Sequence, residues 1–589
     1  MKPALITVLL ATLLAPSSRG QGARILMDGF FGDWDALSPA HTDPVSAPAG
    51  SVDFGRVWIT NDERYLFVRI EVGSEILVQE GNEITMYVDA DDDPGTGQPV
   101  QGIGAELTWH LGSRTGTIYP QAGSPFPVEH AAIGIVTSPT ISSADFELAF
   151  ALDAKPDGTN LLFDGGRIRL FIEDAAGGDR LPDGPGGVSY VFEDASGLPP
   201  LDSTPLGKER AADLRLLSYN VERDGLFEAA RTPAYRRILR ALQPDIIGFQ
   251  EILQYTAEET EQVVSTALPP PDGEQWHSDR ISDLVIVSRF PILQSFPIRG
   301  VTSNPANGAF LLDLREEWGT NLLLIVAHPP CCRADDARQT EIDAMMAFLR
   351  SAMTEGGDVD LDDRTPVVIL GDMNLVGFKE QLNTLLTGEI VNTSVFGLSF
   401  APDWDDTDLA DLLPRHSSLP MTFTWYNEES SFHPGRLDYM IYTDSVLEPA
   451  NRYVLFTPSL PGDTLASHGL LPSDATVASD HLPVVGDFRY ASTGTTNEPR
   501  EVNPSLSLRS SSSVYGSTLP PPAYSARRML SVTLSATASM NVHFRYSDVN
   551  FLYARDVQAN SMPPDCRFYS LPLSARRKAV CPAGNSARH

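Results

Sequence analysis

The sequence predicts several domains: an N-terminal β-sandwich, then an α/β domain, then a poorly ordered tail. The 589 residues, of which 42% are hydrophobic, provide material for about three packed units at about 100–200 residues each. Short apolar runs separated by Gly, Pro, Asp and Asn occupy residues 23–195, a pattern typical of a β-sandwich. Over residues 212–490 apolar runs alternate with helical periodicity, which indicates an α/β domain.

The strands expected in the first region follow its apolar runs, and residues 196–211 form a Pro- and Gly-containing linker after them. In the second region, helical spacing covers Ala234–Leu242 and Asp336–Met353, with Ile342, Met345, Met346 and Leu349 on one face. The expected strands are Val57–Ile59, Tyr65–Ile70, Ile84–Val88, Phe146–Phe150 and Arg167–Ile172 in the first region, and Leu214–Tyr219, Asp245–Phe249, Asp283–Ser288, Leu322–Ala327, Val367–Leu370, Leu437–Ile441 and Pro483–Asp487 in the second.

The N-terminus predicts a secretory signal peptide over residues 1–22. Lys2 supplies a positive start, Ala4–Leu14 is a short apolar run, and small residues follow it. That run is too short to span a bilayer, and no later stretch is long enough. We therefore expect a secreted or cell-surface protein without a transmembrane segment.

Charge is distributed unevenly along the chain. The whole sequence carries a formal charge of −34, while the tail from Thr496 onward has 11 basic and 5 acidic residues. The acidic body would repel polyanions at low salt, and this repulsion would be screened in molar salt. The excess of acid fits either a saline habitat or an ordinary compositional bias.

The tail, residues 491–589, is rich in Ser and Arg and lacks a clear period, so a sorting region, a disordered segment and a shifted reading frame all fit it. Export would permit a disulfide between its cysteines, Cys566 and Cys581. The adjacent pair Cys331–Cys332 could be a vicinal disulfide or a buried thiol pair. No cysteine spacing indicates a zinc site.

Polar side chains stand where the expected strands of the second region begin or end. Because such positions converge at one edge of an α/β sheet, we expect these side chains to lie together. Each signal alone is common in turns, and their joint presence is what predicts an active site. The residues are Asn220, Gln250, Glu251, His328, Asp372, Asn374, Asp438, Asp480 and His481.

The segments that carry these residues resemble the ordered motifs of the endonuclease/exonuclease/phosphatase superfamily. They read SYNVE (218–222), FQEI (249–252), VAH (326–328), GDMN (371–374), RLDY (436–439) and SDH (479–481). The superfamily includes deoxyribonucleases, apurinic endonucleases, sphingomyelinases and inositol-polyphosphate 5-phosphatases. The resemblance implies a four-layer α/β sandwich with two central, mostly antiparallel sheets.

The resemblance also implies a role for each residue. Glu251 would bind Mg²⁺, with Asn220 and Asp480 completing or supporting the site, and Mn²⁺ or Ca²⁺ are alternatives; carboxylate oxygens suit such hard cations. His481 matches the general base and Asp438 the carboxylate that orients it. Asp372 and Asn374 match the pair that aligns the attacking water and binds phosphoryl oxygens. His328 matches the second histidine of the deoxyribonuclease and sphingomyelinase branches, which binds phosphate or protonates the leaving oxygen.

Two segments depart from the family pattern. His328 is followed by Pro-Pro-Cys-Cys, for which we expect a role in shaping the loop that carries His328. Ser282 and Asp283 stand where glycine is common in the family, which leaves the local turn open.

The N-terminal region resembles family 9 carbohydrate-binding modules through Ile25–Trp34, Trp58–Val68 and Tyr87–Gly97. The resemblance makes an extracellular carbohydrate a candidate partner, with Trp34 or Trp109 stacking on a sugar ring or, alternatively, buried in the core. The run Asp89, Asp91, Asp92 and Asp93 could hold a structural Ca²⁺ or be a solvated acidic turn.

These patterns favour a secreted, metal-dependent hydrolase that cleaves phosphoester bonds, most simply phosphodiesters, by attack of water. Nucleic acid, phospholipid and small phosphoesters are all candidate substrates, and the acidic body favours the last two slightly. The alternative is a non-catalytic adhesin or sugar-binding protein with an inactive phosphoesterase-like domain, although the complete set of site residues argues against it.

Overall fold

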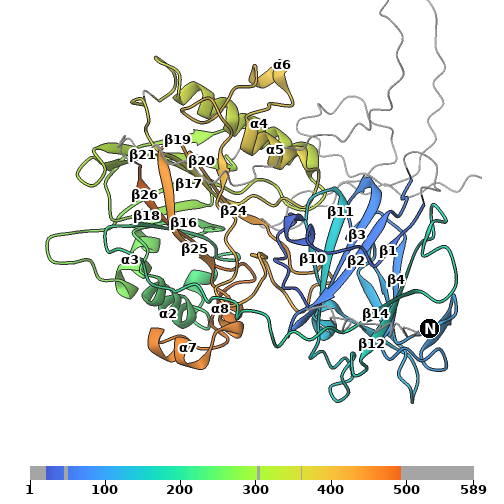
Figure 1. Cartoon of the computed structure of the whole chain (residues 1–589). Coiled ribbons are helices and arrows are strands. Elements are labelled where there is room, and N and C mark those ends of the chain that lie inside the picture. Colours follow the sequence, from blue (N-terminus) through green and yellow to red (C-terminus); the bar gives the residue numbers. More distant parts are fainter. Residues whose placement is uncertain (1–21, 45–50, 301–304, 360, 492–589) are drawn as a thin grey trace, which may run out of the picture. The chain divides into compact units, whose positions relative to one another are not determined.

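The computed structural model describes residues 22–44, 51–300, 305–359 and 361–491, and every structural statement below concerns these residues (Figure 1). The expected signal peptide, apart from Gly22, lies outside the described residues. So do Cys566, Cys581 and all of the tail except Ala491. No helix in the described part is long and apolar enough to cross a membrane.

The N-terminal region contains two antiparallel sheets that share one hydrophobic core, and a separate two-stranded sheet of β5 and β6. The strand orders of the two larger sheets are β1-β2-β3-β11-β10 and β13-β12-β4-β7-β8-β9, and β14 also pairs with β12. Val57 and Leu148 of the first sheet and Ile84 and Ile168 of the second are buried in that core. The elements are η1 (Gly32–Trp34), β1 (His41–Thr42), β2 (Arg56–Asn61), β3 (Tyr65–Ile76), β4 (Ile84–Asp89), β5 (Gln98–Val100), β6 (Ile103–Ala105), β7 (Leu107–His110), β8 (Thr115–Ile118), β9 (Phe126–Val128), α1 (His130–Ile133), β10 (Val136–Ser138), β11 (Ser143–Ala151), β12 (Arg167–Asp174), β13 (Arg180–Leu181) and β14 (Val188–Val191).

Both tryptophans considered for sugar stacking are fully buried. The indole N–H of Trp34 donates to Glu147 Oε2 at 3.0 Å, and the Trp109 ring lies 5.3 Å from that of His433. A sugar ring stacks on an exposed aromatic face, so the alternative of a core role is correct for Trp34 and Trp109, and the stacking role is wrong.

The α/β region contains two six-stranded sheets. Their orders are β17-β18-β16-β15-β26-β25 and β19-β20-β21-β22-β24-β23. Only β15–β16 and β21–β22 are parallel pairs, so both sheets are mostly antiparallel, as expected. The strands are β15 (Leu214–Asn220), β16 (Ile246–Gln250), β17 (His277–Ile281), β18 (Leu284–Ser288), β19 (Ile292–Ile298), β20 (Asn307–Leu314), β21 (Thr320–Ala327), β22 (Val367–Asp372), β23 (Ala410–Asp411), β24 (Asp438–Tyr442), β25 (Leu447–Val454) and β26 (Val484–Tyr490).

Helices cover the outer face of each sheet, which produces four layers. In Figure 1, α2 and α3 lie on one side of the paired sheets, and α4 and α5 lie on the other. Side chains such as Leu216 and Leu324 fill the space between the sheets, while Ile247 packs with the α2 side and Ile369 with the α4 side. The helices are α2 (Thr232–Leu242), α3 (Ala257–Ala267), α4 (Asp335–Ala352), α5 (Glu380–Thr387), α6 (Thr393–Phe396), α7 (Gly462–His468) and α8 (Asp474–Ala478), with 3₁₀ turns η2 (Gly225–Phe227) and η3 (Thr457–Ser459).

Burial on both faces explains why the central strands are continuous apolar runs rather than alternating ones. All seven residues of β15 are buried, as are all six of β22. The face of α4 formed by Ile342, Met345, Met346 and Leu349 is buried in the core, as predicted.

The segment between the two regions is anchored along its length. Thr204 N–H donates to the Ser417 carbonyl at 2.8 Å, and the buried Leu206 accepts from the Tyr453 hydroxyl at 2.8 Å. The N-terminal segment is bound in a similar way, because Met27 bridges Met421 and its carbonyl accepts from the Thr422 hydroxyl at 2.7 Å. The expected linker is therefore an irregular segment that is mostly exposed but held to the α/β region by hydrogen bonds and by the buried Leu206.

A buried ion pair fastens β15 to β26. Arg215 and Asp487, whose side chains are 2% and 0% exposed, form a two-pronged pair at 2.6 and 2.7 Å. The remaining Arg215 nitrogen donates to the carbonyls of Leu206 and Leu242 at 2.7 and 2.6 Å, so the guanidinium is well satisfied.

Arg215→Ala is expected to lower the free energy of unfolding by about 3–5 kcal/mol, because it leaves the Asp487 carboxylate buried without its partner. Urea titration followed by tryptophan fluorescence measures this change. The matched control is Arg315→Ala in the Arg315–Asp313 pair, where Arg315 is 64% exposed; this variant should unfold at nearly the same urea concentration as the parent, because solvent screens the pair. Equal costs for the two variants would contradict the prediction.

Candidate active site

The chain topology brings the predicted side chains to one edge of the two sheets. Asn220 ends β15 and Glu251 follows β16, and these two strands run in parallel. In the other sheet, His328 follows β21 and Asp372 ends the parallel strand β22. The antiparallel strand β24 begins with Asp438 directly opposite Asp372.

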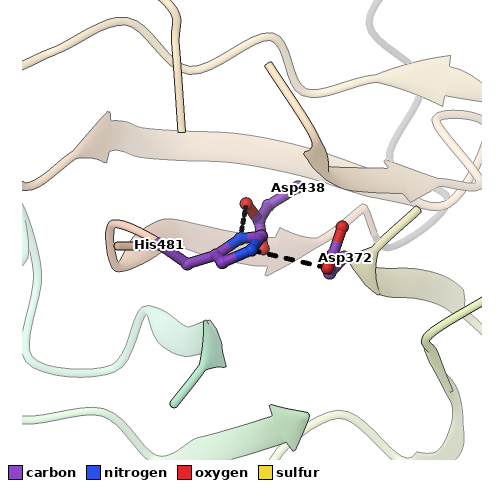
Figure 2. Close-up of side chains that lie close together, drawn as sticks. All are labelled: Asp372, Asp438 and His481. Carbon is purple, nitrogen blue, oxygen red and sulfur yellow. Dashed lines mark hydrogen bonds and ion pairs between the residues drawn. The ribbon is translucent and has the colours of Figure 1, made fainter. Parts of the chain in front are cut away.

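The imidazole of His481 lies between two carboxylates (Figure 2). Its Nδ1 is 2.8 Å from Asp438 Oδ2, and its Nε2 is 3.6 Å from Asp372 Oδ2. The loop that carries His481 is bound to β15, since the Ser479 hydroxyl donates to the Asn220 carbonyl and accepts from the His481 N–H. The predicted pairing of His481 with Asp438 is therefore present in the geometry.

Negative charge controls the protonation of His481. Burial lowers the pKa of this imidazole, but the charges of Asp438 and Asp372 outweigh burial and raise the pKa to about 10. Proton affinity at Nε2 is therefore high, and Asp438 holds Nδ1 so that Nε2 faces Asp372. Without a bound cation this imidazole is therefore itself protonated at neutral pH. A divalent cation bound at this edge would lower the pKa and free Nε2 to accept a proton.

Asp372 is the centre of the site. Its Oδ2 accepts from the amide of Asn220 at 3.0 Å and from that of Asn374 at 3.2 Å, and lies 3.6 Å from both His481 and His328. Burial raises the pKa of Asp372 above its usual value, against the opposing charge of His481. Asn374 has φ 51°, a left-handed conformation that aims its amide at Asp372 and at the Pro329 carbonyl.

A second histidine–carboxylate pair faces the first. His328 Nδ1 is 2.7 Å from Asp283 Oδ2, while its Nε2 is 3.6 Å from Asp372 Oδ2 and 3.9 Å from Glu251 Oε1. Burial lowers the pKa of His328, but the hydrogen bond to Asp283 and the charge of Asp372 raise it to about 9. His328 is therefore a cation at neutral pH, as a group that binds phosphate or protonates a leaving oxygen must be.

Two of these partners had not been predicted from the sequence. Asp283 stands directly before β18, after Ser282 with φ 58°, so the turn left open by the sequence is left-handed and presents a carboxylate to His328. Trp425 donates its indole N–H to Asp480 Oδ2 at 3.0 Å. The departure from glycine at Ser282-Asp283 was the available signal for Asp283; no comparable signal marks Trp425.

The loop after His328 has a covalent and a polar restraint. Cys331 and Cys332 form a vicinal disulfide, which decides between the two alternatives for this pair. The fully buried Arg338 of α4 donates to the carbonyls of Pro330 and Cys332 at 2.8 and 3.2 Å. Because Pro329 accepts from the Asn374 amide, this loop connects His328 to Asn374, in agreement with a loop-shaping role.

The donor set at this edge suits a hard divalent cation. Glu251 has φ 64°, accepts from Asn220 Nδ2 through Oε1 at 3.0 Å and from the Arg223 N–H through Oε2 at 2.8 Å. A carboxylate oxygen has two acceptor directions, so each can still coordinate a cation. Oxygen donors together with an excess of carboxylates over imidazoles match the preferences of Mg²⁺. The buried set Asp372, Asp438 and His481 also brings ligand atoms within 4.8 Å of one another.

Removal of the Asp283 charge is expected to make activity depend on pH. In Asp283→Asn the pKa of His328 should fall from about 9 toward its ordinary 6.5, since burial lowers it and only the charges of Asp372 and Glu251 still raise it. For a full return to about 6.5, the fraction of cationic His328 would drop about thirtyfold at pH 8 but only by about a quarter at pH 6. Rates of diester hydrolysis measured from pH 5.5 to 9 should therefore fall with rising pH in the variant. A profile that is lowered equally at every pH would contradict this role.

Comparison with known proteins agrees with this geometry. Residues 217–481 match the Endonuclease/Exonuclease/phosphatase family. Similar solved structures include a humanized D. rerio TDP2 (16% identity, 47% of this chain and 100% of that chain, TM-score 0.30). Another is ANGEL2, a 2′,3′-cyclic phosphatase (14% identity, 50% of this chain and 99% of that chain, TM-score 0.34). A third is sphingomyelinase C from Streptomyces griseocarneus (16% identity, 47% of this chain and 99% of that chain, TM-score 0.28).

None of the curated proteins matches the chain. The family match covers 265 of the 589 residues, begins in β15 and ends at His481. Residues 217–481 are therefore similar to the endonuclease/exonuclease/phosphatase family.

Proposed function

We propose that this protein hydrolyses phosphodiester bonds by attack of water, with a divalent cation bound at Glu251. The observation that supports it best is the arrangement around Asp372, whose Oδ2 lies 3.6 Å from each of two histidines, each histidine backed by its own carboxylate. A site that must accept one proton and donate another needs two titratable groups on opposite sides of the reacting phosphorus.

In this proposal His481 takes the proton from the attacking water through Nε2, while Asp438 holds the ring and stabilises the imidazolium that forms. Asp372, with Oδ2 near Nε2, orients the water. His328 is protonated at neutral pH, and it neutralises a phosphoryl oxygen or passes its proton to the leaving oxygen, with Asp283 holding its ring. The amide of Asn374 donates to Asp372 and to the Pro329 carbonyl, and in this proposal it supports the reaction by holding the Asp372 carboxylate in position.

Glu251 would hold the cation, with Asn220 and Asp480 as supporting residues. The carboxylates at this edge outnumber the imidazoles, so a cation would offset charge that the two histidines leave uncompensated. When bound, it would supply Lewis-acid stabilisation of the negative charge that develops on the phosphoryl oxygens. Mg²⁺ is the first choice because the donors are hard oxygens, and Mn²⁺ has the same preferences.

The net negative charge of the chain affects which substrates it can bind. Polyanionic nucleic acid is bound largely through Lys and Arg, whereas this chain carries −34 overall. A phospholipid headgroup or a small phosphodiester would meet less repulsion. We therefore rank these two above nucleic acid at low salt, and expect any cleavage of DNA to rise with ionic strength over a range where Mg²⁺ binding is kept saturated.

The experiment that tests the proposed function uses the purified chain after EDTA treatment and desalting. Plasmid DNA, RNA, sphingomyelin, inositol phosphates and bis(p-nitrophenyl) phosphate are incubated with and without Mg²⁺ at about 10 mM, roughly tenfold above a millimolar dissociation constant. Cleavage of at least one diester that requires the cation is the expected result. A folded protein that binds Mg²⁺ and cleaves none of them would favour the non-catalytic alternative.

We further propose that the protein is exported. The N-terminal sequence resembles a signal peptide, and a vicinal disulfide at Cys331–Cys332 persists best in an oxidising compartment. Fractionation of cells that express the chain with a C-terminal tag tests this. Recovery of uncleaved protein in the cytosol alone would contradict it.

A further inference from the structure

Three carboxylates of the N-terminal region, distant in sequence from the active-site residues, lie close together. Each has an oxygen within 4.8 Å of the others. They belong to Asp89 at the end of β4, to Asp91, and to Glu106 just before β7. Asp89 and Glu106 are 0% and 8% exposed, whereas Asp91 is partly exposed, so the cluster is closed on the protein side and open at Asp91.

The two buried carboxylates are each only half satisfied. Gly104 N–H donates to Asp89 Oδ2 at 3.2 Å, and Ala90 N–H donates to Glu106 Oε2 at 2.8 Å. The other oxygens, Asp89 Oδ1 and Glu106 Oε1, are buried and have no hydrogen-bond partner among the described residues. A buried carboxylate oxygen without a partner is costly, and both atoms are free to bind a ligand that is not part of the chain.

No protein cation neutralises the cluster. In the described part of the chain, Asp89, Asp91 and Glu106 have no ion pair with Lys, Arg or His, while the neighbouring Asp92 pairs with Arg169 at 2.5 Å and Arg167 at 3.6 Å. The acidic run is thus divided: Asp92 faces arginines, Asp93 is exposed, and only Asp89 and Asp91 turn toward Glu106. Burial, with Asp91 and Asp89 adding to it, raises the pKa of Glu106 to about 7.

Backbone conformation keeps the space beside Glu106 open. Gly97 has φ 63°, and a Cβ at this position would come within 2.8 Å of Glu106 Oε1. The partly exposed Asp91 is held by neighbours, because it accepts from the Thr96 hydroxyl at 3.2 Å and from the Gln121 amide at 3.0 Å. The oxygens of the three carboxylates therefore lie within 4.8 Å of one another, and a side chain at position 97 would crowd the free oxygen of Glu106.

We propose that Asp89, Asp91 and Glu106 bind one structural calcium ion. Three carboxylates of the chain with an opening to water suit Ca²⁺, which takes six to eight oxygen ligands in irregular geometry. Mg²⁺ usually uses only one or two carboxylates and keeps most of its waters. The site is separate from the proposed catalytic cation at Glu251, and the ion would link β4 to the start of β7.

The test uses the full chain with Glu251→Gln as the parent, so that binding at the catalytic site does not obscure the result. After EDTA treatment, calorimetric titration with CaCl₂ should find one site. At about a hundredfold excess over Kd, Ca²⁺ should raise the melting temperature by about 5–10 °C. Mg²⁺ at the same concentration should have a clearly smaller effect.

The deciding variant is Glu106→Gln in the same parent. In EDTA it should melt at or above the parent temperature, because one of three repelling charges is gone, yet Ca²⁺ should no longer shift it. Asp89→Asn is the second variant if Glu106→Gln fails to fold, and Asp93→Asn, on the same loop but exposed, is the matched control that keeps the full shift.

Loss of the calcium shift in the Glu106 or Asp89 variant, with its retention in Asp93→Asn, supports the site. The proposal is overturned if the parent shows no calcium shift, if Glu106→Gln and Asp89→Asn both keep it, or if Mg²⁺ stabilises as strongly as Ca²⁺. Because thermal stability is the measurement, failure here leaves the proposed phosphodiesterase activity untouched, and the reverse also holds.

Discussion

His481→Ala should reduce cation-dependent hydrolysis of a phosphodiester by about 10²–10⁴-fold, the range that a positioned general base contributes. The reason is geometric. The imidazole is held by Asp438 at 2.8 Å, and its free nitrogen faces Asp372, so removal of the ring takes away the proton acceptor and leaves the water unactivated. The fall should appear in kcat more than in KM, because the base acts in the transition state.

Initial rates on bis(p-nitrophenyl) phosphate, or on the best substrate of the panel, measure this loss at saturating Mg²⁺. The matched control is His468→Ala, a partly exposed histidine at the end of α7, which should keep full activity. Added imidazole should restore part of the rate of His481→Ala and leave His468→Ala unchanged. A purified, folded His481→Ala protein with more than about a tenth of the parental rate would contradict the assignment of the base.

The sequence predicted where the site residues lie better than the contacts that hold them. Asn220, Glu251, His328, Asp372 and His481 were found because an apolar run buried on both faces stops abruptly where a strand meets solvent or substrate. This signal is local. Most expected strand and helix bounds therefore lie within two residues of those in the structure, and the residues of the site lie together at one edge.

Non-local pairing could not be predicted in this way. Asp283 and His328 are 45 residues apart and stand at strand ends in different sheets, so their hydrogen bond depends on how the two sheets pack. The same holds for Met27 and Met421, whose bridge joins the start of the chain to a loop of the α/β region. In the acidic run, the division between Asp92 and its neighbours depends on Arg169, which lies on another strand.

Asp372→Ala should abolish detectable hydrolysis and also lower the free energy of unfolding by about 3–5 kcal/mol near neutral pH. Without this carboxylate, His481 and His328 would face each other as buried cations, and the amide N–H groups of Asn220 and Asn374 would lose their acceptor. The protein should still fold, because the packed sheets do not depend on this residue, but urea unfolding in EDTA should begin at lower denaturant concentration.

The sign of the pH dependence distinguishes this charge effect from a simple cavity. Both histidines have folded-state pKa values, about 10 and about 9, above the ordinary 6.5, so their contribution to stability is complete below pH 6.5 and is lost as pH rises through 9 and 10. The difference in the free energy of unfolding between the parent and Asp372→Ala should therefore be largest near pH 6 and should decrease above pH 9.

Asp372→Asn provides the matched comparison, since it keeps the volume of the side chain and one acceptor oxygen while it removes the charge. It should remain inactive, because the water still lacks a charged partner beside His481, but it should unfold at a higher urea concentration than Asp372→Ala. A gap between the parent and Asp372→Ala that stays constant from pH 6 to pH 10 would mean that lost packing, and not the charge between the histidines, explains the destabilisation.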